Sequence, residues 1–157
     1  SKAPVYVSPL GAQAEMAMEE AWQRMTAGSP AAPGELEVKG RKVPVPMAAG
    51  GSARFTFADL CEQPLGARDY LAITRNYHTV FVENVPLMDR SVQNHAKRFI
   101  NLIDTLYDNG TRLVISAEGP PEALYSADSG TEAFEFARTV SRLHEMQSVE
   151  YLAAKIG

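Results

Sequence analysis

Arg138 and Arg142 are the residues of this sequence whose type and spacing best suit contact with a ligand. They lie one helical turn apart, so a helix presents both guanidinium groups on one face. Glu135 and Glu145 stand three residues from Arg138 and Arg142 respectively, and such spacing also favours ordinary surface ion pairs. The two interpretations are a pair of ligand-binding arginines and an ion-paired helix surface, and the spacing favours the second.

An apolar run that ends in Glu83-Asn84 has the outline of a Walker B strand, whose terminal carboxylate holds magnesium. The usual Asp-Glu pair is missing, so a structural role for Glu83 is the favoured interpretation. The 157 residues also contain no G-x-x-x-x-G-K-[ST] pattern, the loop that wraps the β- and γ-phosphates of a nucleotide. We therefore predict no cofactor-binding residue in this chain.

The sequence gives little support for a nucleophilic active site or for a metal site. Cys61 and His78 could be a nucleophile and a base, but they flank a helix and no third residue orients the histidine. His78, His95 and His144 lack metal-ligand spacing, and Ser116 lacks the glycines of a nucleophile elbow. No metal site is predicted, and Arg138 and Arg142 remain the sole catalytic candidates.

A strand, helix, strand unit must position these groups. Residues 78–83 are β-branched and aromatic, as in a buried strand, and residues 111–117 repeat that pattern. Between them Asp89 suits a helix N-cap and Asn109-Gly110 a helix end. The apolar stripe of this helix consists of Val92, Ala96, Phe99, Ile103 and Leu106. The two strands must run parallel with a right-handed crossover, which puts a ligand beyond their carboxyl ends, near Glu83 and Ser116.

The remaining residues complete one α/β domain over 1–157, a parallel βαβ core flanked by helices with a small appended antiparallel hairpin. Residues 1–28 predict a strand and a helix, and residues 35–57 a β-hairpin region that turns at Lys39-Gly40-Arg41. Pro44 and Pro46 lack ladder donors, so we expect the second hairpin strand at a sheet edge. Residues 58–157 predict a helix at 67–76, the crossover, and C-terminal helices that include 133–146.

Composition limits the function classes. The net charge of −4, with 15 basic and 19 acidic residues, provides no field for a phosphate backbone, so no nucleic-acid partner is expected. Apolar runs fall short of the ~20 residues that cross a bilayer, and we predict no membrane span. The single cysteine suits a reducing compartment. Because Ser1 leads directly into a strand-like run, we expect this chain to be cut from a longer one.

Several motifs, in order and spacing, resemble the ZapE or ATPase-family-gene-one group of P-loop (AAA+-like) ATPases. They lie at residues 6–11, 38–45, 54–66, 69–73, 78–82, 97–108, 116–117, 121–125 and 134–146. The resemblance covers nearly the whole chain and implies its identity as the C-terminal domain of such an ATPase. It places the Walker A, Walker B and asparagine-arginine segments upstream of Ser1.

The resemblance implies a parent protein that binds ATP and magnesium and couples hydrolysis to protein handling. Its partners would be the N-terminal P-loop domain and a protein substrate. For a bacterial version the resemblance implies the division ring protein as a substrate and a cytoplasmic location, and for a eukaryotic version it implies a mitochondrial location. This chain alone should be inactive, although Arg138 or Arg142 could complete the nucleotide site. The alternative is a non-enzymatic protein-interaction module that presents the hairpin around Gly40 or the Pro-rich turn.

Overall fold

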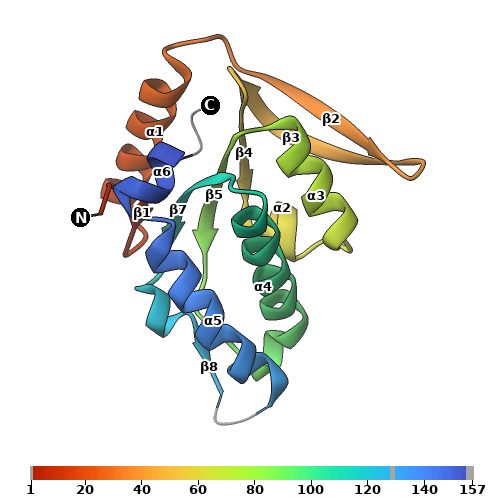
Figure 1. The fold of residues 1–157 in the computed structure, drawn as a ribbon, viewed down its shortest axis with the longest axis vertical. Coiled ribbons are helices and arrows are strands. Elements are labelled where there is room, and N and C mark those ends of the chain that lie inside the picture. Colours follow the sequence, from red (N-terminus) through yellow and green to blue (C-terminus); the bar gives the residue numbers. More distant parts are fainter. Residues whose placement is uncertain (1, 128–129, 155–157) are drawn as a thin grey trace.

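The computed structural model describes residues 2–127 and 130–154, and its helices surround one mixed β-sheet (Figure 1). Within these residues six strands form the sheet in the order β1-β7-β5-β4-β3-β2. The strands are β1 (Tyr6–Val7), β2 (Ala32–Val38), β3 (Arg41–Ala49), β4 (Ser52–Thr56), β5 (Thr79–Val85) and β7 (Arg112–Ala117). Strands β1, β7, β5 and β4 pair in parallel, whereas β3 pairs antiparallel with β4 and β2 pairs antiparallel with β3. The predicted α/β class is confirmed.

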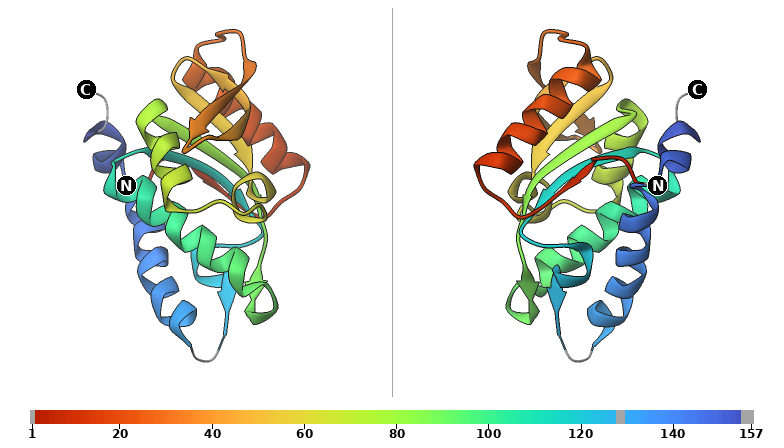
Figure 2. Two further views of the ribbon diagram at one scale, coloured as in Figure 1. Left: turned by 90° about the vertical axis from the view of Figure 1, so that its right-hand side faces the viewer. Right: turned by 90° about the vertical axis from the view of Figure 1, so that its left-hand side faces the viewer.

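Helices cover both faces of this sheet (Figure 2). They are α1 (Ala12–Thr26), α2 (Phe57–Cys61), α3 (Ala67–Asn76), α4 (Gln93–Asp108), α5 (Thr131–Glu145) and α6 (Val149–Ala154). The 3-10 turns η1 (Arg90–Val92) and η2 (Pro121–Ala123) lie beside a second small sheet of β6 (Met88–Asp89) and β8 (Tyr125–Ser126). No helix in the described part of the chain is both long and apolar enough to cross a bilayer.

The predicted crossover is confirmed as β5, α4 and β7. The two strands are parallel neighbours, with Val80 opposite Leu113 and Val82 opposite Ile115. Asp89 accepts a hydrogen bond of 2.9 Å from the Ser91 N–H and so caps η1, which leads into α4. The helix ends before Gly110, whose φ of 65° lies in the left-handed region that glycine adopts without a Cβ clash.

Two apolar clusters form the core, one on each face of the sheet. Trp22 of α1 meets Phe81 of β5 edge-on, with ring centroids 5.1 Å apart. On the opposite face Phe99 of α4 lies between the rings of Phe57 and Phe136, at 6.0 and 6.1 Å. Of the predicted stripe, Ala96, Phe99, Ile103 and Leu106 are buried in this cluster, and Val92 of η1 is partly buried against it.

The antiparallel hairpin is present and continues the same sheet through β4. Lys39 and Gly40 have φ of 52° and 78°, the two positive values of a type I′ turn. The expectation that the second strand lies at an edge is wrong, because β3 pairs with both β2 and β4 and the edge is β2. Pairing with β4 begins at Met47, so Pro44 and Pro46 fall in the part of β3 that does not pair with β4.

Candidate functional site

Arg54 of β4 and Glu83 of β5 lie near the carboxyl ends of two parallel strands, where ligands of α/β sheets usually bind. Glu83 lies opposite Thr56, two residues from Arg54, so both side chains share the face that α1 covers. Arg54 donates from Nε and Nη2 to the two carboxylate oxygens of Glu83, at 2.7 and 3.1 Å. Only 12% of the Arg54 side chain and 19% of the Glu83 side chain is exposed. The arrangement is a bidentate, mostly buried ion pair.

Helix α1 supplies further partners for Arg54. The Glu19 carboxylate accepts from Nη1 at 2.8 Å, and the guanidinium lies 5.7 Å from the centre of the Trp22 ring. Hydrogen bonds from Gln23 and from Arg54 lower the pKa of Glu19, and the bond to Glu83 raises the pKa of Arg54. The guanidinium is therefore paired with two carboxylates, those of Glu19 and Glu83.

A β-bulge in β5 positions Glu83. Pairing with β7 shifts register between Val82 and Val85, and Asn84 between them has a φ of 65°. The Asn84 N–H donates to the buried Ser116 hydroxyl at 2.9 Å. Ser116 therefore stabilises the bulge, a role that its sequence context did not reveal.

A pocket of about 250 Å³ opens beside this pair, and we name it the Arg54 pocket. Its lining residues are Glu19, Pro46, Met47, Arg54, Phe55, Thr56, Asp59 and Glu83. Asp59 and Thr56 bond each other as a capping box, with the Thr56 N–H 2.8 Å from the Asp59 carboxylate. Three carboxylates thus surround one guanidinium that is already paired, so the pocket repels phosphate rather than attracting it. The favoured structural role of Glu83 agrees with this geometry.

Arg138 and Arg142 lie on the side of α5 that faces α4. Both guanidinium groups bond Asp104, Arg138 at 3.2 Å and Arg142 more closely. Arg142 also stacks over the Tyr107 ring, 4.8 Å from its centre, and lies 3.9 Å from the Asp108 carboxylate. The bound carboxylate is therefore on a neighbouring helix, instead of on Glu135 or Glu145 as the ion-pair interpretation expected.

These arginines also do not lie at the carboxyl ends of the strands, where we expected a ligand to bind. Asp104 and Asp108 occupy the last turns of α4, which lead to the amino end of β7. Arg142 is held there, away from the carboxyl ends near Glu83 and Ser116. Glu145, its expected neighbour, instead accepts a hydrogen bond of 2.8 Å from the Tyr107 hydroxyl.

Cys61 and His78 are at opposite ends of neighbouring parallel strands. Cys61 closes α2 beyond the carboxyl end of β4, where its thiol is fully buried and burial raises its pKa. His78 precedes β5 and packs on Gly51, and its Nδ1 lies 2.8 Å from the Thr79 hydroxyl. The structure therefore does not bring the Cys61 and His78 side chains together.

The other two histidines are equally separate. The His95 ring packs against Phe57, with centroids 6.4 Å apart, and His144 bonds Glu122 and Lys2. Within the described residues no group of three histidine, cysteine, aspartate or glutamate side chains is arranged to hold a metal ion.

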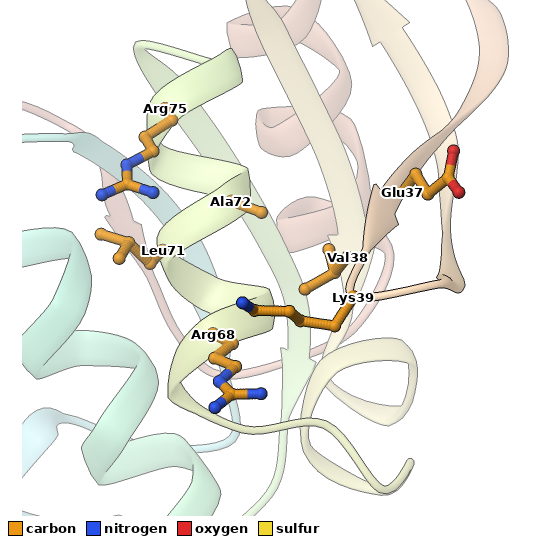
Figure 3. Close-up of a pocket in the computed structure, with 7 residues that line it drawn as sticks. All are labelled: Glu37, Val38, Lys39, Arg68, Leu71, Ala72 and Arg75. Carbon is orange, nitrogen blue, oxygen red and sulfur yellow. The ribbon is translucent and has the colours of Figure 1, made fainter.

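A second pocket of about 250 Å³ lies between the β2–β3 turn and α3, and we name it the hairpin–α3 pocket (Figure 3). It is lined by Glu37, Val38, Lys39, Arg68, Leu71, Ala72 and Arg75. This pocket was not predicted from the sequence. A partial signal was available, because Arg68 and Arg75 stand seven residues apart and so share a helical face.

Comparison with known proteins gives a consistent result over nearly the whole chain. The AFG1-like ATPase family model matches residues 1–155. Cell division protein ZapE of Escherichia coli K12 is 35% identical over 152 residues, which cover 97% of this chain and 40% of ZapE. Lactation elevated protein 1 homolog B of Danio rerio is 36% identical over 151 residues, which cover 76% of this chain and 30% of that protein. No solved structure matches. The chain therefore spans less than half the length of these curated relatives.

Proposed function

The chain belongs to the AFG1-like ATPase family, and on that premise we propose that it is the C-terminal domain of a P-loop ATPase. The observation that carries the proposal is the family match over residues 1–155. Since the chain corresponds to 40% of ZapE, the proposal leaves room for a P-loop domain elsewhere in the same protein.

In this proposal ATP and magnesium bind the P-loop domain, and the described chain is a partner of that domain without its own nucleotide site. Two observations support it. The printed sequence has no phosphate-binding P-loop pattern, and the Arg54 pocket is lined by three carboxylates. The chain alone is then inactive toward ATP.

The proposed cellular role is ATP-driven handling of another protein. One relative is named a cell division protein, and this name supports a role in division for a bacterial version of the chain. The client would then be the division ring protein, and the location the cytoplasm.

The test compares two proteins, this chain and the longer protein that contains it. The longer protein should hydrolyse Mg-ATP, and the chain alone should neither hydrolyse it nor give heat in calorimetric titration. Micromolar affinity of the chain alone for Mg-ATP would contradict the division of labour proposed here. An inactive longer protein would contradict the ATPase itself.

Arg138 and Arg142 are the candidates for completing the nucleotide site of the longer protein, although both bond Asp104 of α4 in this chain. In the longer protein, Arg138→Ala and Arg142→Ala should be assayed separately for turnover and melting temperature. A loss of roughly a hundredfold or more in turnover, with melting unchanged, would support a catalytic arginine. Near-normal turnover in both variants would mean that the two arginines only hold α5 against α4 through Asp104.

A non-enzymatic interaction module is the second candidate. The Phe134 side chain on α5 is 84% exposed, and β2 leaves one edge of the sheet unpaired within the described residues. Both features suit protein contacts. ATP hydrolysis by the longer protein that depends on a P-loop lysine would decide against this candidate.

A further inference from the structure

The hairpin–α3 pocket gathers three cationic side chains, Lys39, Arg68 and Arg75. Within the described part of the chain none of the three forms a salt bridge, whereas the neighbouring Arg41 is paired with Asp69. All three are exposed. The local positive charge stands out because the whole chain carries a net charge of −4. An anionic group is the ligand that this set of side chains can recognise.

The turn supplies Lys39 and α3 supplies Arg68 and Arg75 to the lining of this pocket, and the Arg75 guanidinium points away from Lys39 (Figure 3). The positive φ values of Lys39 and Gly40 place Lys39 in the type I′ turn, and its side chain extends toward α3 (Figure 3). The Glu37 carboxylate points away from Lys39 and Arg68 in the same view. The single acidic residue of the lining therefore does not neutralise the pocket.

The floor and size of the pocket restrict the ligand further. Val38, Leu71 and Ala72 are apolar, so the ligand must combine a charged end with an aliphatic stem. The volume of about 250 Å³ lies below the ~300 Å³ at which small-molecule sites begin. A glutamate or aspartate side chain of another protein fits these limits better than a nucleotide.

The free edge of β2 borders the pocket through Glu37 and Val38. Glu35 lies opposite Pro44, and proline has no N–H, so this pair is not the hydrogen-bonded kind. Pair types alternate along the strand, so Glu37 and Lys42 also form a non-hydrogen-bonded pair. The N–H and C=O of Glu37 therefore point away from β3 to the free edge of β2. An extended segment can bond these groups as an added strand.

We infer that the hairpin–α3 pocket binds an acidic side chain of an extended segment from another protein, which pairs with the free edge of β2. Alternation along the segment puts every second side chain on the α3 side, where Lys39, Arg68 and Arg75 bind carboxylates. The intervening side chains lie on the side of Glu35 and Glu37, so they are neutral or basic. This binding needs no nucleotide and stands apart from the proposed ATPase activity.

The test measures binding of a fluorescein-labelled peptide, Thr-Glu-Thr-Glu-Thr-Glu-Thr, to the whole chain by fluorescence anisotropy. The double variant Arg68→Gln/Arg75→Gln should weaken binding at least ~10-fold, because two charges that face the ligand are lost. The matched control, Arg24→Gln/Lys97→Gln, removes the same charge from exposed positions on α1 and α4 and should change binding less than ~2-fold. Circular dichroism checks that both variants remain folded.

Three further probes separate the parts of the inference. A peptide with glutamine in place of glutamate should bind weakly, and equal binding would overturn the recognition of carboxylates. In an added strand only every second amide N–H donates to β2. Two peptides, each N-methylated on one alternate set of amides, should therefore differ in affinity. Unchanged affinity of both peptides would overturn strand addition. Seven-residue oligothymidylate should bind more weakly than the acidic peptide. Equal or tighter binding of the oligonucleotide would assign the pocket to nucleic acid and overturn the protein ligand.

Discussion

Arg54 shows how one side chain can join elements that are distant in sequence, since it bonds Glu19 on α1 and Glu83 on β5. Its bond to Glu83 is mostly removed from water and so is stronger than an exposed ion pair, whereas the Glu19 side chain is 53% exposed. At this position an arginine of β4 joins helix α1 to the neighbouring strand β5.

We expect Arg54→Met to lower the free energy of unfolding by about 2 kcal/mol, between the values for exposed and fully buried pairs. The physical reason is that the Glu83 carboxylate, whose side chain is 19% exposed, would lose its bidentate partner. Urea denaturation measures the loss. In the same background Glu83→Gln should restore part of it, and two additive losses would show that the groups are not coupled.

The Cys61 thiol should be unreactive in the folded protein. It is fully buried, burial raises its pKa, and thiol reagents attack the thiolate. Ellman's reagent should label it slowly under native conditions and at once in denaturing guanidinium chloride. Rapid native labelling would mean that α2 opens readily.

At the scale of elements, α4 is the helix that most other helices contact. It lies against α2, α3 and α5 as well as the sheet, and it ends at Asn109 as the sequence predicted, whereas the predicted N-cap Asp89 caps the preceding η1. It contacts α5 at two points. Phe99 stacks on Phe136, and Asp104 forms an ion pair with Arg142.

Phe99→Ala should cost roughly 3 to 5 kcal/mol of stability, the range for a buried phenylalanine whose cavity cannot collapse. Phe99 is fully buried between Phe57 and Phe136. Phe134→Ala on α5 is the matched control, because that ring is 84% exposed, and it should change stability by less than ~0.5 kcal/mol. Similar losses in both variants would contradict the packing of α4 on the sheet.

Asp104→Asn should lower stability by about 1 kcal/mol, because it removes the charge that both Arg138 and Arg142 bind on the neighbouring helix. Asp108→Asn is the control. Its carboxylate is 65% exposed and 3.9 Å from Arg142, so a change below ~0.5 kcal/mol is expected. Chemical denaturation measures the stability of both variants. A larger loss of stability for Asp108→Asn would show that Asp104 is not the main ionic contact between α4 and α5.

At the scale of the whole molecule, the two ends of the described chain are tied together. The Ala3 N–H bonds the Gln147 carbonyl at 2.8 Å, and the Tyr151 hydroxyl bonds the Thr111 carbonyl at 2.8 Å. The larger apolar cluster also joins Val45 of the hairpin to Tyr151 of α6. Contacts between early and late segments favour unfolding in one step.

The isolated chain should therefore unfold cooperatively. Trp22 is the single tryptophan and lies on the α1 face, so its fluorescence reports that face alone, whereas far-ultraviolet circular dichroism reports all helices. The two signals should have the same midpoint in urea. An earlier transition of Trp22 would show that α1 unfolds separately.

The crossover, the helix at 67–76 and the hairpin turn could be predicted because their causes are local. Capping at Asp89, the left-handed residue Gly110 and the stripe through Phe99 depend on residues within a few turns of one another. The family could also be predicted from sequence, since its motifs span the chain and the family match confirms it.

Tertiary structure alone decided the partners of the polar side chains. Periodicity tells which face of an element a residue occupies, but it does not tell which other element covers that face. Arg142 and Asp104 are 38 residues apart, and Arg54 and Glu83 are 29 apart. The sequence offered only the nearby Glu135 and Glu145 as partners for Arg138 and Arg142. The edge position of β2 and the hairpin–α3 pocket likewise exist only after the sheet has assembled, because strand order depends on packing between segments that no local pattern connects.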